Sequence, residues 1–171
     1  IQISSDAIRN KKQVNLKSFR SSKSAKITDR NVEPFDYLPD YRSVWCYEYE
    51  SRSCKQFKLA RIHEIELINR NWENESLHKV YFTDSFRISS EKEKDNIEAK
   101  LSLKACNLLL EEFPLSREYV KEENGFYKLK IPVAGYQGIG RFVMGLPGEI
   151  EVLGSKGFKE FLRVEQKKFF D

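Results

Sequence analysis

The sequence contains few of the side chains that most often carry catalysis or bind metal ions. It has two histidines, His63 and His78, and three cysteines among its 171 residues. No two of these residues have the spacing of a zinc site, and Cys46 and Cys54 fall on predicted strands, away from a helix N-terminus that would lower a thiol pKa. We therefore expect no metal site, no Cys–His nucleophile, no cofactor and no enzymatic activity.

Long apolar runs are also absent. No segment approaches the roughly 18 apolar residues of a membrane helix, and the first residues lack the apolar core of a signal peptide. The odd number of cysteines favours reduced thiols, which are typical of cytosolic proteins. We therefore expect a cytoplasmic protein without membrane contacts. Because the sequence does not begin with Met, we also expect it to start inside a longer chain.

The positive charge is concentrated in the first part of the chain. Residues 1–62 contain 13 Lys and Arg against 7 Asp and Glu, and the remaining residues contain 17 against 19. An anionic partner would therefore meet the first part. The alternative is a solvated basic surface without a specific partner.

Residues 44–68 have the pattern of a β-hairpin, because two runs of alternating apolar residues flank a short polar turn at 51–53. If Glu50 lies opposite Cys54, alternation along the strands brings one set of side chains to a single face. This set consists of Trp45, Tyr47, Tyr49, Lys55, Phe57, Leu59 and Arg61. The face is either an aromatic platform edged by two cations, which suits a flat anion, or a core face with two basic residues at its margin.

The order of predicted elements indicates an α+β protein with two domains. Several short strands without a long helix predict a small closed β-barrel over residues 1–95. A polar run at 89–96 marks the domain boundary. Residues 96–171 then follow the order strand–helix–strand–strand–helix–strand of a ferredoxin-like unit, with one more helix at the end.

Local signals support this second domain. Pro114 stops the first helix, Asn124 and Gly125 form the strongest short hairpin turn of the sequence, and Ser155 caps the last helix.

Lys55, Phe57 and Arg61 alternate along the second strand of the hairpin, and we expect the basic loop 20–26 to face them. Arginine forms bidentate contacts with phosphate, and an aromatic ring stacks a nucleic-acid base with a gain of about 1–3 kcal/mol. The pattern therefore suits a single-stranded nucleic acid or a nucleotide-like ligand.

Three segments resemble the WYL domain of bacterial transcriptional regulators. They are residues 30–35 (RNVEPF), 44–47 (VWCY) and 55–62 (KQFKLARI). The second half is similar to the WCX extension that commonly follows this domain. The resemblance implies an Sm-like or SH3-like barrel that binds an effector, often nucleic acid or a nucleotide. It also implies an N-terminal winged helix-turn-helix, which these residues do not contain.

The same resemblance implies a set of ligand contacts, which fall on Phe19, Ser21, Lys55, Phe57 and Arg61. The sequence departs from the family pattern at several positions. Phe19 stands where a tyrosine is usual, Lys55 where arginine is common, and Ala60 where an acidic residue is frequent. Trp45, which supplies the first letter of the family name, is expected to anchor the barrel core rather than contact the ligand.

The function implied is that of the effector-sensing and dimerisation region of a bacterial transcriptional regulator. Its partners would be a nucleic acid or nucleotide effector, a second copy of the chain, and promoter DNA reached through the missing helix-turn-helix. The alternative is a protein–protein interaction module with neither a small-molecule nor a nucleic-acid ligand.

Overall fold

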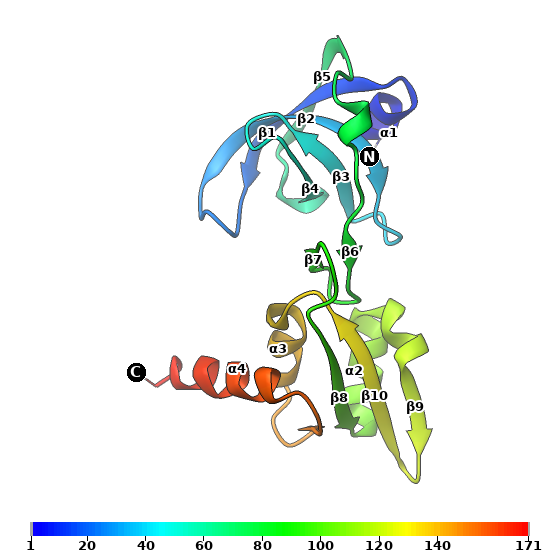
Figure 1. The fold of residues 1–171 in the computed structure, drawn as a ribbon, viewed down its shortest axis with the longest axis vertical. Helices are drawn as coiled ribbons and strands as arrows, with labels where there is room; N and C mark the ends of the chain where they lie inside the picture. The colour runs from blue at the N-terminus through cyan, green and yellow to red at the C-terminus, as the bar shows by residue number, and fades with distance from the viewer. Residues whose placement is uncertain (1, 171) are drawn as a thin grey trace. The chain divides into compact units, whose positions relative to one another are not determined.

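The computed structural model describes residues 2–170 and divides the chain into two compact units, Ile1–Val80 and Tyr81–Asp171. Figure 1 shows helices and a sheet in each unit, so the protein is of the α+β class. Among the described residues, no helix has the length and apolar character needed to span a bilayer.

The first unit is built on one antiparallel sheet with the strand order β4-β3-β2-β1-β5, which bends strongly in Figure 1. Its elements in chain order are α1 (Gln2–Arg9), β1 (Lys12–Arg20), β2 (Ile27–Tyr37), β3 (Ser43–Glu48), β4 (Ser53–Lys58), the 3₁₀ turn η1 (Leu59–Arg61), β5 (Glu64–Asn71) and the 3₁₀ turn η2 (Glu75–Leu77). One face of the sheet and Ala7 of α1 enclose the core, whose buried members are Ala7, Val14, Leu16, Phe19, Val32, Val44, Cys46 and Phe57.

This sheet does not close into the predicted barrel. Within residues 2–170, β4 and β5 lie at the two edges of the sheet and share no ladder. The physical reason lies between them: β4 ends at Lys58, and η1 turns the chain away before β5 pairs with β1. The sequence pattern had suggested a strand that continued through Arg61.

The hairpin register also differs from the prediction. Tyr47, not Glu50, lies opposite Cys54, and the ladder ends at the pair Glu48 and Ser53. The turn is therefore longer than the predicted one and comprises residues 49–52, with Arg52 at a positive φ of 51°. Because side chains alternate, this odd shift exchanges the faces of one strand relative to the other.

The predicted aromatic platform is consequently not formed. Phe57 faces Val44 inside the core, whereas Trp45 lies opposite Gln56 on the other face of the hairpin. Trp45 is nevertheless buried, with 2% of its surface exposed.

The second unit contains the strand–helix–strand–strand–helix–strand order that the sequence predicted. After the ribbon of β6 (Phe82–Thr83) and β7 (Ser89–Ser90), its elements are β8 (Asp95–Leu101), α2 (Leu103–Glu112), the 3₁₀ helix η3 (Pro114–Tyr119), β9 (Val120–Glu123), β10 (Phe126–Val133), α3 (Tyr136–Met144), β11 (Ile150–Val152) and α4 (Lys156–Lys167). The sheet is antiparallel with the order β11-β8-β10-β9.

The helices of this unit pack against one face of its sheet. Buried side chains of β8 and β10 meet those of α2, α3 and α4 in a core that includes Ile97, Leu129, Leu109, Ile139 and Phe158. In Figure 1, α2 lies behind β8 and β10, and the opposite face of the sheet is turned toward the viewer.

Along the chain, the boundary between the two compact units falls between Val80 and Tyr81, whereas the sequence predicted a boundary between residues 95 and 96. Segment 81–95 packs with the second unit because Phe86 is buried in its core. In addition, the Asp84 carboxylate accepts a hydrogen bond from the Ala134 amide at 2.9 Å.

Candidate ligand-binding site

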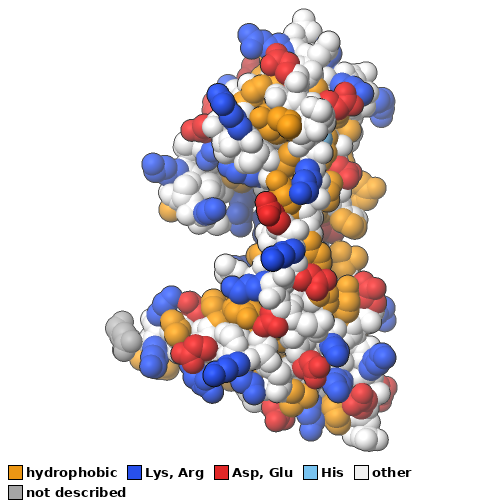
Figure 2. All heavy atoms as spheres, viewed as in Figure 1, with side chains coloured by type: hydrophobic (Ala, Val, Ile, Leu, Met, Phe, Trp, Pro, Cys, Tyr) orange, Lys and Arg blue, Asp and Glu red, His pale blue; other side chains and the backbone are white. Residues whose placement is uncertain are grey.

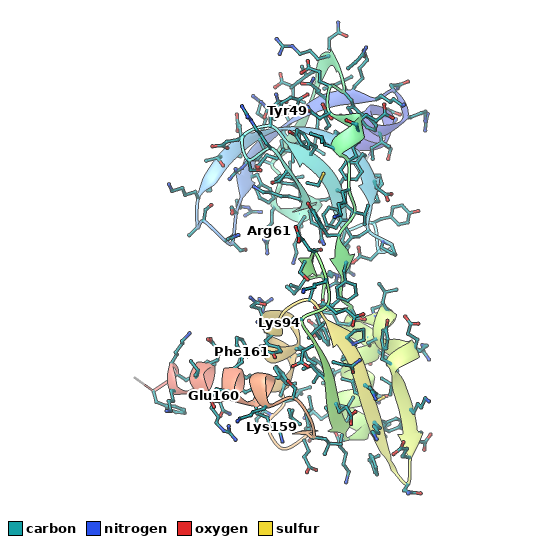
Figure 3. All side chains as sticks on the ribbon, viewed as in Figure 1. Tyr49, Arg61, Lys94, Lys159, Glu160 and Phe161 are labelled. Carbon is teal, nitrogen blue, oxygen red and sulfur yellow. The ribbon has the colours of Figure 1, made fainter. Side chains whose placement is uncertain are left out.

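The loop between β1 and β2 and the turn η1 border a shallow depression of about 420 Å³ in the first unit. We call it the basic depression, and its lining residues are Arg20, Ser21, Ser22, Ala25, Lys26, Ile27 and Arg61. Two of the five predicted ligand contacts, Ser21 and Arg61, therefore lie together. Figure 3 labels Arg61 at the end of the first unit away from Tyr49.

The loop is held in shape by its own polar groups. The amide of Ser21 donates to the carbonyl oxygen of Lys26 at 3.0 Å, which closes the loop at its base. The amide of Ser24 donates to the Ser21 hydroxyl oxygen at 3.2 Å, and Ala25 adopts a positive φ of 52°. The Ser21 hydroxyl keeps its own proton, which can be donated to a ligand.

Three cations line the depression: Arg20 and Lys26 at the two ends of the loop, and Arg61 in η1. The Arg20 guanidinium donates to the carbonyl oxygen of Ala60 at 3.2 Å and so ties the loop to η1. Arg61 is the last residue of η1, and the exposed Lys26 is the loop residue immediately before β2. None of the seven lining residues is acidic, so the charge of the depression is positive.

Phe19 and Phe57 do not line the basic depression. Their side chains are buried, with 8% and 2% of their surface exposed, and their rings pack edge to face in the core with centroids 5.0 Å apart. In this arrangement neither ring offers a face on which a ligand base could stack.

Lys55 also lies outside the lining of the depression. Its ammonium group pairs with the carboxylate of Glu48, which is buried and also accepts from Arg30 at 2.9 Å and from the Ser51 hydroxyl at 2.5 Å. Burial opposes ionisation of Glu48, but the hydrogen bonds from Lys55 and Ser51 and the charge of Arg30 outweigh it and lower its pKa. In this structure, the Lys55 ammonium group therefore neutralises the buried carboxylate of Glu48.

Arg20 and Lys26 were not among the predicted contacts. The sequence marked 20–26 as a basic loop and singled out only Ser21 from it. The sequence does show that Lys and Ser are frequent in this loop. Which of the loop cations lie beside Arg61, however, depends on the residue at which β1 ends, and apolar alternation alone does not determine that residue.

A second polar cluster lies around the fully buried carboxylate of Glu33. It accepts hydrogen bonds from the Tyr49 hydroxyl at 2.5 Å, the Glu73 amide at 2.6 Å and the Asn74 amide at 3.1 Å, and it contacts Nε2 of His78 at 2.7 Å. Burial raises the pKa of Glu33, but these hydrogen bonds outweigh it, and the net effect is a lowered pKa. Burial and the bond to Glu33 raise the pKa of Tyr49.

Aromatic contacts complete this cluster. The His78 ring stacks on Phe35 with centroids 4.4 Å apart, and Trp72 meets it edge-on at 4.6 Å. The Lys79 amide donates to the Cys54 sulfur at 3.4 Å. The cluster therefore fastens residues 72–79 over the outer face of β2, β3 and β4. We assign it a structural role.

The three cysteines are free and buried. Burial raises the pKa of each thiol, which keeps the fraction of reactive thiolate low.

Comparison with known proteins gives similarity at the level of structure. No family model and no curated protein matches the sequence. Among solved structures, "Proteasome accessory factor B/C (PafBC) of Arthrobacter aurescens" has a TM-score of 0.43 and 18% identity, over 95% of this chain and 25% of that one. A structure titled "Crystal structure of a CRISPR Cas-related protein" has a TM-score of 0.49 and 12% identity, over 98% of this chain and 50% of that one. Most of this chain is thus structurally similar to a quarter of the first protein and half of the second.

Proposed function

We propose that the first unit binds a phosphate-bearing ligand, either a nucleotide or a short single-stranded nucleic acid, in the basic depression. The observation that carries this proposal is the meeting of Arg20, Lys26 and Arg61 around one depression without an acidic lining residue. Arginine suits phosphate because its planar guanidinium forms two parallel hydrogen bonds, and lysine adds a mobile point charge.

Each lining side chain has a distinct part in this proposal. Arg61 forms the bidentate phosphate contact, Lys26 pairs with a second phosphate oxygen, and the Ser21 hydroxyl donates a further hydrogen bond. Arg20 keeps the loop against η1 through its bond to Ala60. The loop would need to move little on binding, because its base is already closed by hydrogen bonds.

The wider role proposed is that of the effector-sensing and dimerisation part of a bacterial transcriptional regulator. The segments that resemble the WYL domain support this role, and the basic depression gives it a place for the effector. A ligand that binds one arrangement of two copies more tightly would shift the population toward it. That shift would set the spacing of DNA-binding domains attached to the copies.

The test compares two doubly substituted chains of equal charge. Lys26→Gln with Arg61→Gln removes two cations from the depression, whereas Arg52→Gln with Arg70→Gln removes two exposed cations elsewhere in the same unit. The measurement is fluorescence anisotropy of a labelled oligothymidylate, with a nucleoside monophosphate as competitor, at about 50 mM and about 200 mM salt.

We expect the first variant to bind at least about tenfold more weakly, because hydrogen bonds to charged groups contribute about 1.5–3 kcal/mol each. The control variant should change affinity by less than about twofold, as is usual for exposed charges away from a contact. Equal loss in both variants would show that only the overall charge matters and would overturn the site. Absence of binding by the unmodified chain at low salt would overturn the ligand class and favour a protein-interaction module.

A further inference from the structure

The second unit presents a row of three lysines on the face of its sheet opposite the helices. Lys128 of β10 lies directly opposite Lys121 of β9 on one side and Lys100 of β8 on the other. We call Lys121, Lys128 and Lys100 the lysine row. Neighbouring strands are about 4.8 Å apart, so the row crosses roughly 10 Å of the sheet.

This arrangement is unfavourable for the isolated unit. Like charges directly opposite each other on adjacent strands repel, and the row contains two such pairs in succession. Glu151 of β11 stands beyond Lys100, but among the described residues neither Lys121 nor Lys128 forms an ion pair. Lys130, two residues beyond Lys128 on the same face of β10, differs from them because its ammonium group pairs with Glu98 at 3.4 Å.

An aromatic ring lies beside the row. Lys100 holds its ammonium group 4.4 Å from the centre of the half-buried Phe126 ring. At the other end, Lys121 and Lys128 line a depression of about 310 Å³, together with Glu118, Tyr119, Glu123 and Lys130. In Figure 2, this face of the unit shows both basic and acidic side chains over β8, β10 and β9.

We propose that this face binds single-stranded nucleic acid, with the phosphate backbone lying across β9, β10 and β8 along the lysine row. Lysine ammonium groups are point charges that neutralise phosphates without reading sequence. When a strand binds, a base can replace the Lys100 ammonium over Phe126 while that ammonium turns to a phosphate. The Phe126 ring and the Lys100 ammonium group then each keep a partner, and the phosphates relieve the repulsion between the lysines of the row.

Two observations favour a single strand over a duplex or an acidic peptide. Phe126 offers a stacking face, which a paired base inside a duplex cannot reach and which an acidic peptide does not use. RNA-recognition motifs bind unpaired bases in this way, with aromatic rings on the open face of a four-stranded antiparallel sheet. The carboxylates of Glu98 and Glu123 lie on the two sides of the row, and Glu151 lies at its end beyond Lys100, so these carboxylates would confine an anionic strand to the row.

This surface is separate from the basic depression and does not rest on the function proposed above. The test therefore starts from the Lys26→Gln, Arg61→Gln chain, in which the basic depression has been neutralised. Into it we introduce Lys121→Gln with Lys128→Gln. The matched control carries Lys104→Gln with Lys156→Gln, two exposed lysines at the starts of α2 and α4.

The measurement is anisotropy of a labelled oligothymidylate over a series of salt concentrations. Neutralising Lys121 and Lys128 should weaken binding at least about fivefold at low salt. It should also make the slope of log affinity against log salt shallower by about 1.4, since each phosphate contact on a single strand contributes about 0.7. The control should keep the affinity and slope of the starting chain. Unchanged binding in the lysine-row variant, or equal loss in the control, would overturn the proposal.

Two further measurements test the details of the proposal. Phe126→Leu keeps an apolar side chain but removes the stacking face, so it should weaken binding about fivefold. In ¹⁵N NMR spectra of the full chain, the oligothymidylate should shift the amides of Lys100, Lys121 and Lys128. A duplex that competes as well as the single strand, or shifts confined to the first unit, would contradict the assignment.

Discussion

The rings of Phe19 and Phe57 pack edge to face with centroids 5.0 Å apart, and both are members of the buried core of the first unit. Phe57→Ala should therefore lower the free energy of unfolding of this unit by about 3–5 kcal/mol, the usual cost of deleting a buried aromatic ring. Phe57→Leu should cost less, because it refills most of the volume. Denaturant unfolding followed by tryptophan fluorescence measures this unit alone, since Trp45 and Trp72 are the two tryptophans of the chain.

The same variants distinguish a core residue from a ligand contact. If Phe57 contacts a ligand instead, Phe57→Leu would lose most of its binding at unchanged stability. If it is a core residue, Phe57→Leu should retain oligonucleotide affinity within about twofold, because small volume changes in a core leave the surface in place.

The ion pair between Lys55 and Glu48 gives the second prediction. Lys55→Gln should lower the free energy of unfolding by about 1 kcal/mol, because Glu48 is buried but Lys55 is partly exposed and Arg30 remains as a partner. Glu48→Gln should cost more, about 2–3 kcal/mol, since it leaves Arg30, whose side chain is only 16% exposed, with only the exposed Glu50 as an ionic partner. Lys55→Gln should leave oligonucleotide affinity nearly unchanged. If a stably folded Lys55→Gln chain bound the oligonucleotide much more weakly, Lys55 would be a ligand contact after all.

The pH dependence of the first unit follows from Glu33 and Glu48. Hydrogen bonds lower the pKa of both carboxylates in the folded chain against the opposing effect of burial. A carboxylate with a lowered folded pKa stabilises the fold above its unfolded pKa, and this contribution disappears as pH falls through the folded pKa. The free energy of unfolding should therefore fall progressively below about pH 5.

Glu33→Gln provides the control for this pH effect. The amide cannot titrate, so the variant should be less stable at neutral pH and lose less stability between about pH 5 and about pH 3. Tryptophan fluorescence in denaturant series at several pH values measures both quantities. A Glu33→Gln chain with the acid profile of the unmodified protein would show that Glu33 does not contribute.

The sequence was most informative where a local signal fixed the geometry. Asn124 and Gly125 both have positive φ, and the hairpin they form pairs Glu123 with Phe126. The Ser155 hydroxyl oxygen accepts from the Phe158 amide at 3.1 Å, as a helix cap does. These signals act within a few residues, so no knowledge of distant partners was needed.

The first unit was less predictable because its hairpin lacks such a signal. Residues 49–52 contain neither glycine nor asparagine, and apolar residues occur on both faces of β3, whose six residues are all buried. Alternation then fits more than one register. The same uncertainty hid the partner of Lys55: Glu48 lies on the neighbouring strand, and only the correct register shows that it is within reach. Ser21 and Arg61 line the same depression, and neither position depends on that register; that they bind a ligand stays a prediction.

Neutralising Lys128, the central residue of the lysine row, should change stability and binding in opposite directions. Lys128→Gln removes the central charge and both repulsive pairs, so it should raise the stability of the second unit by about 0.5 kcal/mol. For a unit of this size the increase corresponds to a melting temperature about 2–4 °C higher. Thermal unfolding followed by circular dichroism measures it, with Lys167→Gln as the control that should cause no increase, because the exposed Lys167 lies in the last turn of α4, where a cation is favourable. A purely structural lysine would give the opposite result, because its removal would lower the melting temperature. We therefore expect Lys128→Gln to raise the stability of the second unit and to weaken its binding of single-stranded nucleic acid. This combination is expected of a side chain that contributes to binding and not to folding.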